Sequence, residues 1–251
     1  MEQTHLPMSH DPLLVMASFL IAIFAAYAAL AIINRLRQTS VNKNWLWLGA
    51  VTFGLGVWAM HFTAMTALQL NMLVAYDPLL TLISVLFAIV GAAAAFQVVS
   101  QPKVGFKEIL TSGFFLGAGI GTMHYVGMFA MRLNAQLSFD PLLVVASVLV
   151  AVALGTFGIW TLISPAFSRV PFRHLVTAVI TGSAIPFMHY TAMLAARFTS
   201  TGSEQIHSMV ASGGLLSLNV FLLFAVAILG LPLFLTSLLE ASTEVAQEAE
   251  A

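Results

Sequence analysis

Seven long apolar runs dominate this sequence and limit what it can fold into. Each is about 20 residues or longer, the length that a helix needs to cross the hydrocarbon core of a bilayer. Backbone polar groups find no water there, so a spanning segment is a helix or part of a closed barrel. These runs are continuous rather than alternating, which excludes barrel strands, and the sequence predicts an all-α membrane protein with seven transmembrane helices. The runs cover residues 12–34, 45–68, 78–100, 107–131, 141–163, 172–196 and 212–236.

The charge distribution predicts an orientation. Only 8% of the residues are charged, and cytoplasmic loops of membrane proteins carry the excess of Lys and Arg. The basic residues after the first, third and fifth runs outnumber those on the opposite side, so we expect an extracytoplasmic N-terminus and a cytoplasmic C-terminus. Residues 1–11 are then an outer tail, 12–236 the helical domain and 237–251 a cytoplasmic helical linker or tail. The first group contains Arg35, Arg37, Lys43, Lys103, Lys107, Arg169 and Arg173, and the second Arg132 and Arg197.

The chain repeats itself three times. Asp-Pro-Leu-Leu occurs at 11–14, 77–80 and 140–143, each time just before an odd-numbered run. Asp is a good helix N-cap and Pro suits the first helical position, so these tetrapeptides are interpreted as helix starts. Two spans per repeat keep each copy in the same orientation. The architecture predicted is three parallel two-helix repeats followed by a seventh helix.

A histidine motif lies near the end of the second, fourth and sixth runs. It reads Met-His-Phe-Thr-Ala-Met at 60–65, Met-His-Tyr-Val-Gly-Met at 123–128 and Met-His-Tyr-Thr-Ala-Met at 188–193. The three runs share one direction, so the histidines should share one depth in the outer half of the bilayer, where ionisable residues are expensive and usually functional. A glycine lies seven residues before each histidine, on the same helical face, and small residues allow membrane helices to approach closely. We therefore expect the histidine faces to point into the bundle; the glycines are Gly54, Gly117 and Gly182.

The methionines of the motif suggest a soft metal site. One follows each histidine by four residues on the same helical face, and another precedes it at about 100° around the helix. Imidazole and thioether ligands favour copper over zinc, magnesium or iron, although a methionine can equally be a core filler and a histidine an interhelical hydrogen bonder. The leading ligands predicted are His61, His124 and His189, supported by Met65, Met128 and Met193, with Met60, Met123 and Met188 as weaker candidates.

The tripled motif resembles the MHYT domain, a bacterial integral-membrane sensor module. Met-His-Tyr-Thr stands intact at 188–191, while Phe62 and Val126 depart from the pattern in the other copies. The resemblance covers residues 12–236. It implies a multi-pass protein of the bacterial inner membrane that binds copper through the motif Met and His residues and senses a diatomic gas such as O2, CO or NO. It also implies signalling to a cytoplasmic output domain, often a cyclic-di-GMP enzyme. The chain itself is then no enzyme.

Other functions remain open on the residues alone. A retinal protein is rejected, since the lysines lie in or beside inner loops. A haem protein would leave the third motif unexplained. An intramembrane zinc hydrolase could combine the histidines with Asp77 or Asp140, and a copper transporter would suit the methionines. His5, Met8 and His10 before the first run, and His207 and Met209 before the last, are candidates for copper capture. Whether the chain forms a homodimer is also open, and no nucleic-acid binding is expected at a net charge of −1.

Overall fold

The computed structural model describes residues 7–38, 43–70, 72–164, 167, 172–200 and 216–217. Within these ranges six helices are long and apolar enough to cross a membrane, and they match the first six predicted spans to within a few residues. The predicted seventh helix, 212–236, and the tail 237–251 lie outside the described residues except for 216–217. The helices are α1 (Pro12–Gln38), α2 (Lys43–Ala67), α3 (Pro78–Val99), α4 (Phe106–Phe129), α5 (Pro141–Ile163) and α7 (Arg173–Met193).

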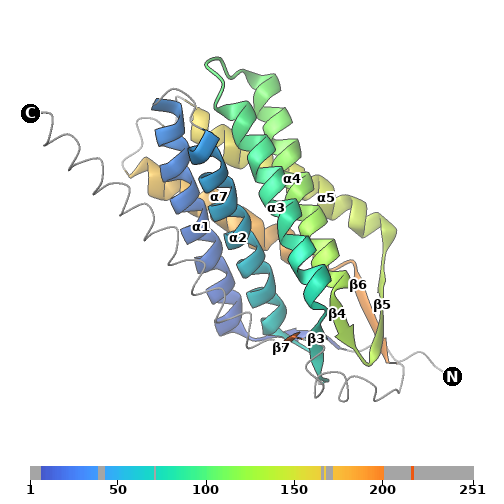
Figure 1. The fold of residues 1–251 in the computed structure, drawn as a ribbon. Coiled ribbons are helices and arrows are strands. Elements are labelled where there is room, and N and C mark those ends of the chain that lie inside the picture. The colour runs from blue at the N-terminus through green and yellow to red at the C-terminus, as the bar shows by residue number, and fades with distance from the viewer. Residues whose placement is uncertain are drawn as a thin grey trace, which may run out of the picture.

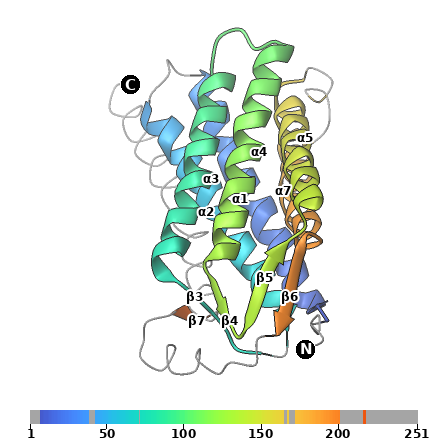
Figure 2. The ribbon, with the colours of Figure 1, turned by 90° about the vertical axis from the view of Figure 1, so that its right-hand side faces the viewer.

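The six helices form a ring that follows the order of the chain. Each packs against the next, and α7 packs back against α1. Figures 1 and 2 show them as one bundle of roughly aligned rods. The helices that carry the histidine motifs, α2, α4 and α7, alternate around the ring with α1, α3 and α5. The predicted three-fold repeat of helix pairs is therefore visible in the packing.

The Asp-Pro pairs start helices as predicted. Each Asp side chain accepts backbone N–H groups two to three residues further on, and each Pro occupies the first helical position, where its missing N–H has no cost. Asp11 Oδ1 accepts from Leu13 and Leu14, Asp77 Oδ1 from Leu80, and Asp140 Oδ1 from Leu142 and Leu143.

Short strands, which the sequence did not predict, join the two helices of each pair. They lie together at one end of the bundle, hereafter the strand end, which is the lower end in Figures 1 and 2. The strand before α1, α3 or α5 pairs antiparallel with the strand after α2, α4 or α7: β1 with β2, β3 with β4, and β5 with β6; β7 adds to β3. Their bounds are β1 Ser9–His10, β2 Leu68–Gln69, β3 Val74–Tyr76, β4 Met131–Leu133, β5 Ala135–Phe139, β6 Ala196–Ser200 and β7 Leu216–Ser217.

One backbone hydrogen bond also joins the two helices of each pair at the strand end. The amide of each capping Asp donates to a carbonyl six residues after the motif histidine. The distances are 2.9 Å from Asp11 to Ala67, 2.8 Å from Asp77 to Ala130 and 2.9 Å from Asp140 to Ala195. The end of each histidine helix is thereby fixed to the start of its partner helix.

The glycines seven residues before the histidines join neighbouring pairs. A Cβ added at any of them would lie within 3.0 Å of a backbone nitrogen of the next helix, so only glycine allows this approach. The distances are 2.8 Å from Gly54 to Ile89 on α3, 2.5 Å from Gly117 to Val152 on α5, and 2.7 Å from Gly182 to Ile23 on α1. The predicted role of these glycines is confirmed, and the partner residues are themselves equivalent, each lying twelve residues after a capping Asp.

Candidate metal centre

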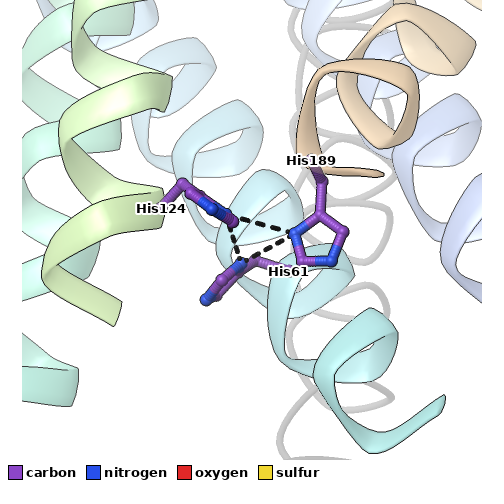
Figure 3. Close-up of side chains that lie close together, drawn as sticks. All are labelled: His61, His124 and His189. Atoms are coloured by element: carbon purple, nitrogen blue, oxygen red, sulfur yellow. Dashed lines mark hydrogen bonds between the residues drawn. The ribbon is translucent and has the colours of Figure 1, made fainter. Parts of the chain in front are cut away.

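The three motif histidines meet inside the bundle. His61 comes from α2, His124 from α4 and His189 from α7, and each is one to two turns before the end of its helix. Their exposed fractions are 0%, 1% and 1%. Figure 3 shows the three rings pointing toward one another from three different helices. The predicted common depth and inward orientation of these side chains are confirmed.

The Nδ1 atoms of the three rings form a nearly equilateral triangle. The separations are 3.1 Å between His61 and His189, 3.3 Å between His61 and His124, and 3.2 Å between His124 and His189. Imidazole nitrogens that bind one ion at about 2.0–2.1 Å are themselves roughly 3.3–3.5 Å apart. The triangle is therefore close to the size that a single metal ion requires.

Hydrogen bonding alone does not satisfy this arrangement. A neutral imidazole carries one N–H, so a ring nitrogen that donates has no lone pair left to accept. Three facing Nδ1 atoms therefore cannot close a ring of hydrogen bonds, and a bare Nδ1 forces the proton onto Nε2. All three Nε2 atoms are buried and lack a hydrogen-bond partner in the part of the chain that the structure describes. A cation would accept all three inward lone pairs, so the donor set fits a metal ion.

The carboxylates lie elsewhere. Among the described residues, the cluster able to hold a metal consists of the three histidines alone. Asp77 and Asp140 cap helices and form ion pairs at the strand end, 3.1 Å from Arg132 and 2.9 Å from Arg197 respectively. Backbone hydrogen bonding from Leu80, together with Arg132, lowers the pKa of Asp77 below its usual value. These groups are used as caps and ion-pair partners, as the helix-start interpretation expects.

The six motif methionines are all buried, with exposed fractions from 0% to 3%. Met65, Met128 and Met193 lie one turn beyond the histidines toward the strand end, and Met60, Met123 and Met188 precede them directly. Met128 also lines a depression of about 230 Å³ at the strand end. Burial suits both a ligand and a core filler, so the methionine ligands stay a prediction.

A glycine makes room for one ring of the triad. A Cβ on Gly127 would lie 2.7 Å from Nε2 of His61, so a larger residue would displace that imidazole. The equivalent positions in the other two motifs are Ala64 and Ala192. The sequence held the signal, since Gly127 is where the motif departs from alanine, but only the packing identifies what the glycine faces.

Hydrogen bonds between helices flank the triad, and sequence reasoning missed them. Tyr125 and Tyr190, which directly follow triad histidines, each reach a serine on the next helix of the ring. The hydroxyl separations are 2.6 Å from Tyr125 to Ser147 and 3.4 Å from Tyr190 to Ser18. Both serines lie seven residues after a capping Asp, a repeat that could have been found in the sequence.

Of the histidines predicted to capture copper, His10 is described. It lies in β1, and its ring centroid is 5.5 Å from that of Tyr190 in an edge-on contact. Partial burial lowers its pKa. Met8 is exposed. His5, His207 and Met209 lie outside the described residues.

Comparison with known proteins identifies the family. The chain matches MHYT, described as "Bacterial signalling protein N terminal repeat", over residues 3–42, 54–112, 117–174 and 182–246. The chain belongs to this family. The last three MHYT segments begin at the glycines that contact the next helix, and each segment contains one triad histidine. The expected family resemblance is thus confirmed.

Several MHYT relatives are signalling proteins. The bifunctional diguanylate cyclase/cyclic di-GMP phosphodiesterase MucR of Pseudomonas aeruginosa is 34% identical over 76% of this chain and 28% of its own length. The cyclic di-GMP phosphodiesterase NbdA of the same species is 32% identical over 74% of this chain and 24% of its own. The signaling protein YkoW of Bacillus subtilis is 29% identical over 76% and 24%. The chain thus spans about a quarter of the length of these curated relatives. No solved structure matches it.

Proposed function

We propose that this MHYT domain is a copper-dependent membrane sensor whose metal is held by His61, His124 and His189. The observation that carries the proposal is the convergence of three Nδ1 atoms, 3.1–3.3 Å apart, in a buried site to which none of the described residues contributes a carboxylate. Neutral ligands in a low-dielectric interior suit a monovalent ion, and the soft donors of the six motif methionines favour copper among the transition metals. The buried methionines are the proposed supporting ligands.

The proposed orientation places the strand end outside the cell. It follows from the excess of Lys and Arg at the opposite end. The two arginines at the strand end are the exceptions, and both are paired with aspartates, which supports this assignment because a paired arginine contributes less net positive charge. The triad then lies in the outer half of the bilayer, and 237–251 continue into the cytoplasm of a bacterial inner membrane.

The proposed signal is a diatomic gas or the copper and redox state outside the cell. A bound copper ion would supply an open coordination position for such a gas.

The three histidine helices alternate with three partner helices and contact them through backbone at the glycines, so a small movement of one histidine ring would be transmitted to the packing of the whole bundle. By analogy with MucR and NbdA, the output is proposed to be a cytoplasmic cyclic-di-GMP enzyme, in the same chain or a separate one. The domain itself would sense rather than catalyse, as a monomer or a homodimer.

Metal analysis of the purified protein tests the proposal. We would measure metal content by mass spectrometry in the wild type and in His61→Ala, His124→Ala and His189→Ala, with His174→Ala at the far end of α7 as the control. Copper retained by the wild type and by His174→Ala, but lost from the triad variants, is expected. Zinc in place of copper would favour the intramembrane hydrolase, and copper flux across vesicles would favour the transporter. A protein that holds no metal after loading would contradict the metal site.

A further inference from the structure

Two small cavities lie inside the bundle, between the triad and the end opposite the strands. The first has a volume of about 20 Å³ and lies between α4, α5 and α7, where Ile120, Ile185 and Met188 line it. The second has a similar volume of about 20 Å³ and extends toward α1. The two share three lining residues: Phe53, Leu116 and Thr181. Met188 directly precedes His189 in the sequence, whereas the triad histidines themselves are not among the residues that line the two cavities.

The cavities arise where the three-fold repeat is broken. Phe53, Leu116 and Thr181 occupy the same repeat position, eight residues before each triad histidine. Two of them are large and apolar, whereas the third is a threonine that fills less space. The neighbouring position on α5 is Gly158, where an added Cβ would lie 2.8 Å from Cγ2 of Thr181. Glycine on α5 thus accommodates the Thr181 methyl, and the layer is incomplete because threonine is smaller than the phenylalanine and leucine of the other repeats.

The Thr181 hydroxyl is the polar feature of both cavities, since every other lining residue is apolar. In membrane helices Ser and Thr hydroxyls commonly donate to a carbonyl three or four residues earlier, as Thr156 and Thr161 do here at 2.8 Å and 2.7 Å. Oγ1 of Thr181 is buried and makes no hydrogen bond within the described ranges. A buried hydroxyl without a partner is unfavourable, so a ligand offering one acceptor would be stabilised there.

The lining decides which ligand fits. A buried water typically makes about three hydrogen bonds, and these cavities offer one hydroxyl. A cavity needs at least roughly 10–15 Å³ to hold a water-sized guest, so a space of about 20 Å³ limits the guest to a molecule little larger than water. The chemistry therefore selects a small neutral diatomic molecule that partitions from lipid and accepts at most one weak hydrogen bond.

We infer that the cavities around Thr181 form a binding site for an apolar diatomic gas, distinct from the metal position itself. Gas entering through the bilayer would be held next to Met188 and Thr181. The biological meaning of this site rests on the proposed gas-sensing function, but the binding itself does not depend on a metal.

Xenon is the probe, because it tests gas binding in the cavities without requiring the proposed metal. The xenon-129 chemical shift would be titrated with metal-free full-length wild type, Thr181→Leu, Thr181→Val and the control Val179→Leu, whose side chain is 42% exposed on the same helix. Wild type, Thr181→Val and Val179→Leu are expected to give a saturable shift, and Thr181→Leu to lose it because its larger side chain restores the layer. An equal shift in Thr181→Leu, or none in the wild type, would overturn the inference.

Metal content measured on the same variants distinguishes this result from failure of the proposed function. Copper retained in Thr181→Leu without a xenon shift supports a separate gas site. A saturable xenon shift in a protein that binds no copper would sink the metal sensor but leave the cavity site standing. If Thr181→Leu does not fold, dissolved O2 should broaden the methyl NMR signal of Met188 in the wild type more than that of exposed Met8; equal broadening would count against the site.

Discussion

The first repeat differs from the other two at the hydrogen bond beside the triad. In the second and third repeats a tyrosine hydroxyl joins the histidine helix to a serine on the next helix. In the first repeat Phe62 has no hydroxyl, yet the equivalent Ser84 still has a partner: Nε1 of Trp58 lies 3.2 Å from its Oγ and 3.1 Å from the carbonyl of Thr81. Trp58 is one turn before Phe62. The link is kept while the residue that makes it changes, which indicates that the ring of helices requires a hydrogen bond there.

The strand end shows the same difference. Eight residues after the triad histidine, Arg132 and Arg197 pair with the capping aspartates of their own helix pairs. The first repeat has Gln69 at this position, and its Oε1 accepts from Ser9 at 3.2 Å. A neutral hydrogen bond thus replaces an ion pair. The glycine contacts and the histidines, like the Asp caps and the motif methionines, are common to all three repeats. These shared features should be the ones on which folding and metal binding depend most.

The largest effect is expected where the repeats agree. Gly117→Ala should destabilise the protein by about 3 kcal/mol, because its Cβ meets the backbone of Val152 and overpacking costs roughly 1–3 kcal/mol or more. Gly54→Ala and Gly182→Ala should be similarly damaging. Gly121→Ala is the control, since its Cβ would meet the nearest atom at an ordinary 3.8 Å. Denaturant titration in detergent measures this, and equal stability of Gly117→Ala and Gly121→Ala would refute the close approach.

A second substitution tests the motif position three residues after the histidine, where the second repeat alone has glycine. Gly127→Ala should push against His61 and weaken metal binding by about 10–100-fold, the range seen when groups supporting a ligand are changed. Ala192→Gly, at the equivalent position of the third repeat, only removes bulk and should leave the affinity near that of the wild type. Competition titration with a copper chelator measures both. Unchanged affinity in Gly127→Ala would show that His61 can move without loss.

The hydrogen bonds beside the triad, whose donors differ between repeats, should contribute less to the stability of the fold. Trp58→Phe should lower the free energy of unfolding by about 1–2 kcal/mol, since it removes a buried donor and leaves its acceptors unpaired. Tyr125→Phe should cost about 1 kcal/mol, and Tyr190→Phe less, because its separation is 3.4 Å rather than 2.6 Å. If the link is what matters, adding Phe62→Tyr to Trp58→Phe should recover part of the loss; further destabilisation would mean that the repeats are not interchangeable here.

The described helices and the meeting of the histidines were predictable from sequence for different reasons. Helix starts carry a local signal, as at Asp77 and Asp140, and spans are set by length and hydropathy. The common depth of the histidines follows from the repeat, but the 3.1–3.3 Å triangle depends on helix rotation that no local pattern encodes. The strands are two to five residues long and pair segments more than 50 residues apart. Most are too short to show an alternating pattern, and no local signal identifies their partners. The role of Trp58 was hidden because it compensates for a residue in another turn.

The smallest effect is expected at the strand end, where the repeats differ most openly. The pKa of Asp77 is lowered in the folded protein, so its ion pair stabilises the fold at pH values above the unfolded pKa of about 4 and loses that contribution as the pH falls through the lower folded value. Arg132→Gln copies the neutral pair of the first repeat. Because both side chains are partly exposed, it should cost only about 0.2–1 kcal/mol at pH 7 and less at pH 2, toward which Asp77 becomes protonated. Melting temperatures of the wild type and Arg132→Gln at both pH values measure this, with Gln69→Ala as a control that should show no such pH dependence. A constant difference between wild type and Arg132→Gln across this range would mean that Arg132 acts through its hydrogen bond to the Phe129 carbonyl, 3.0 Å away, rather than through its charge.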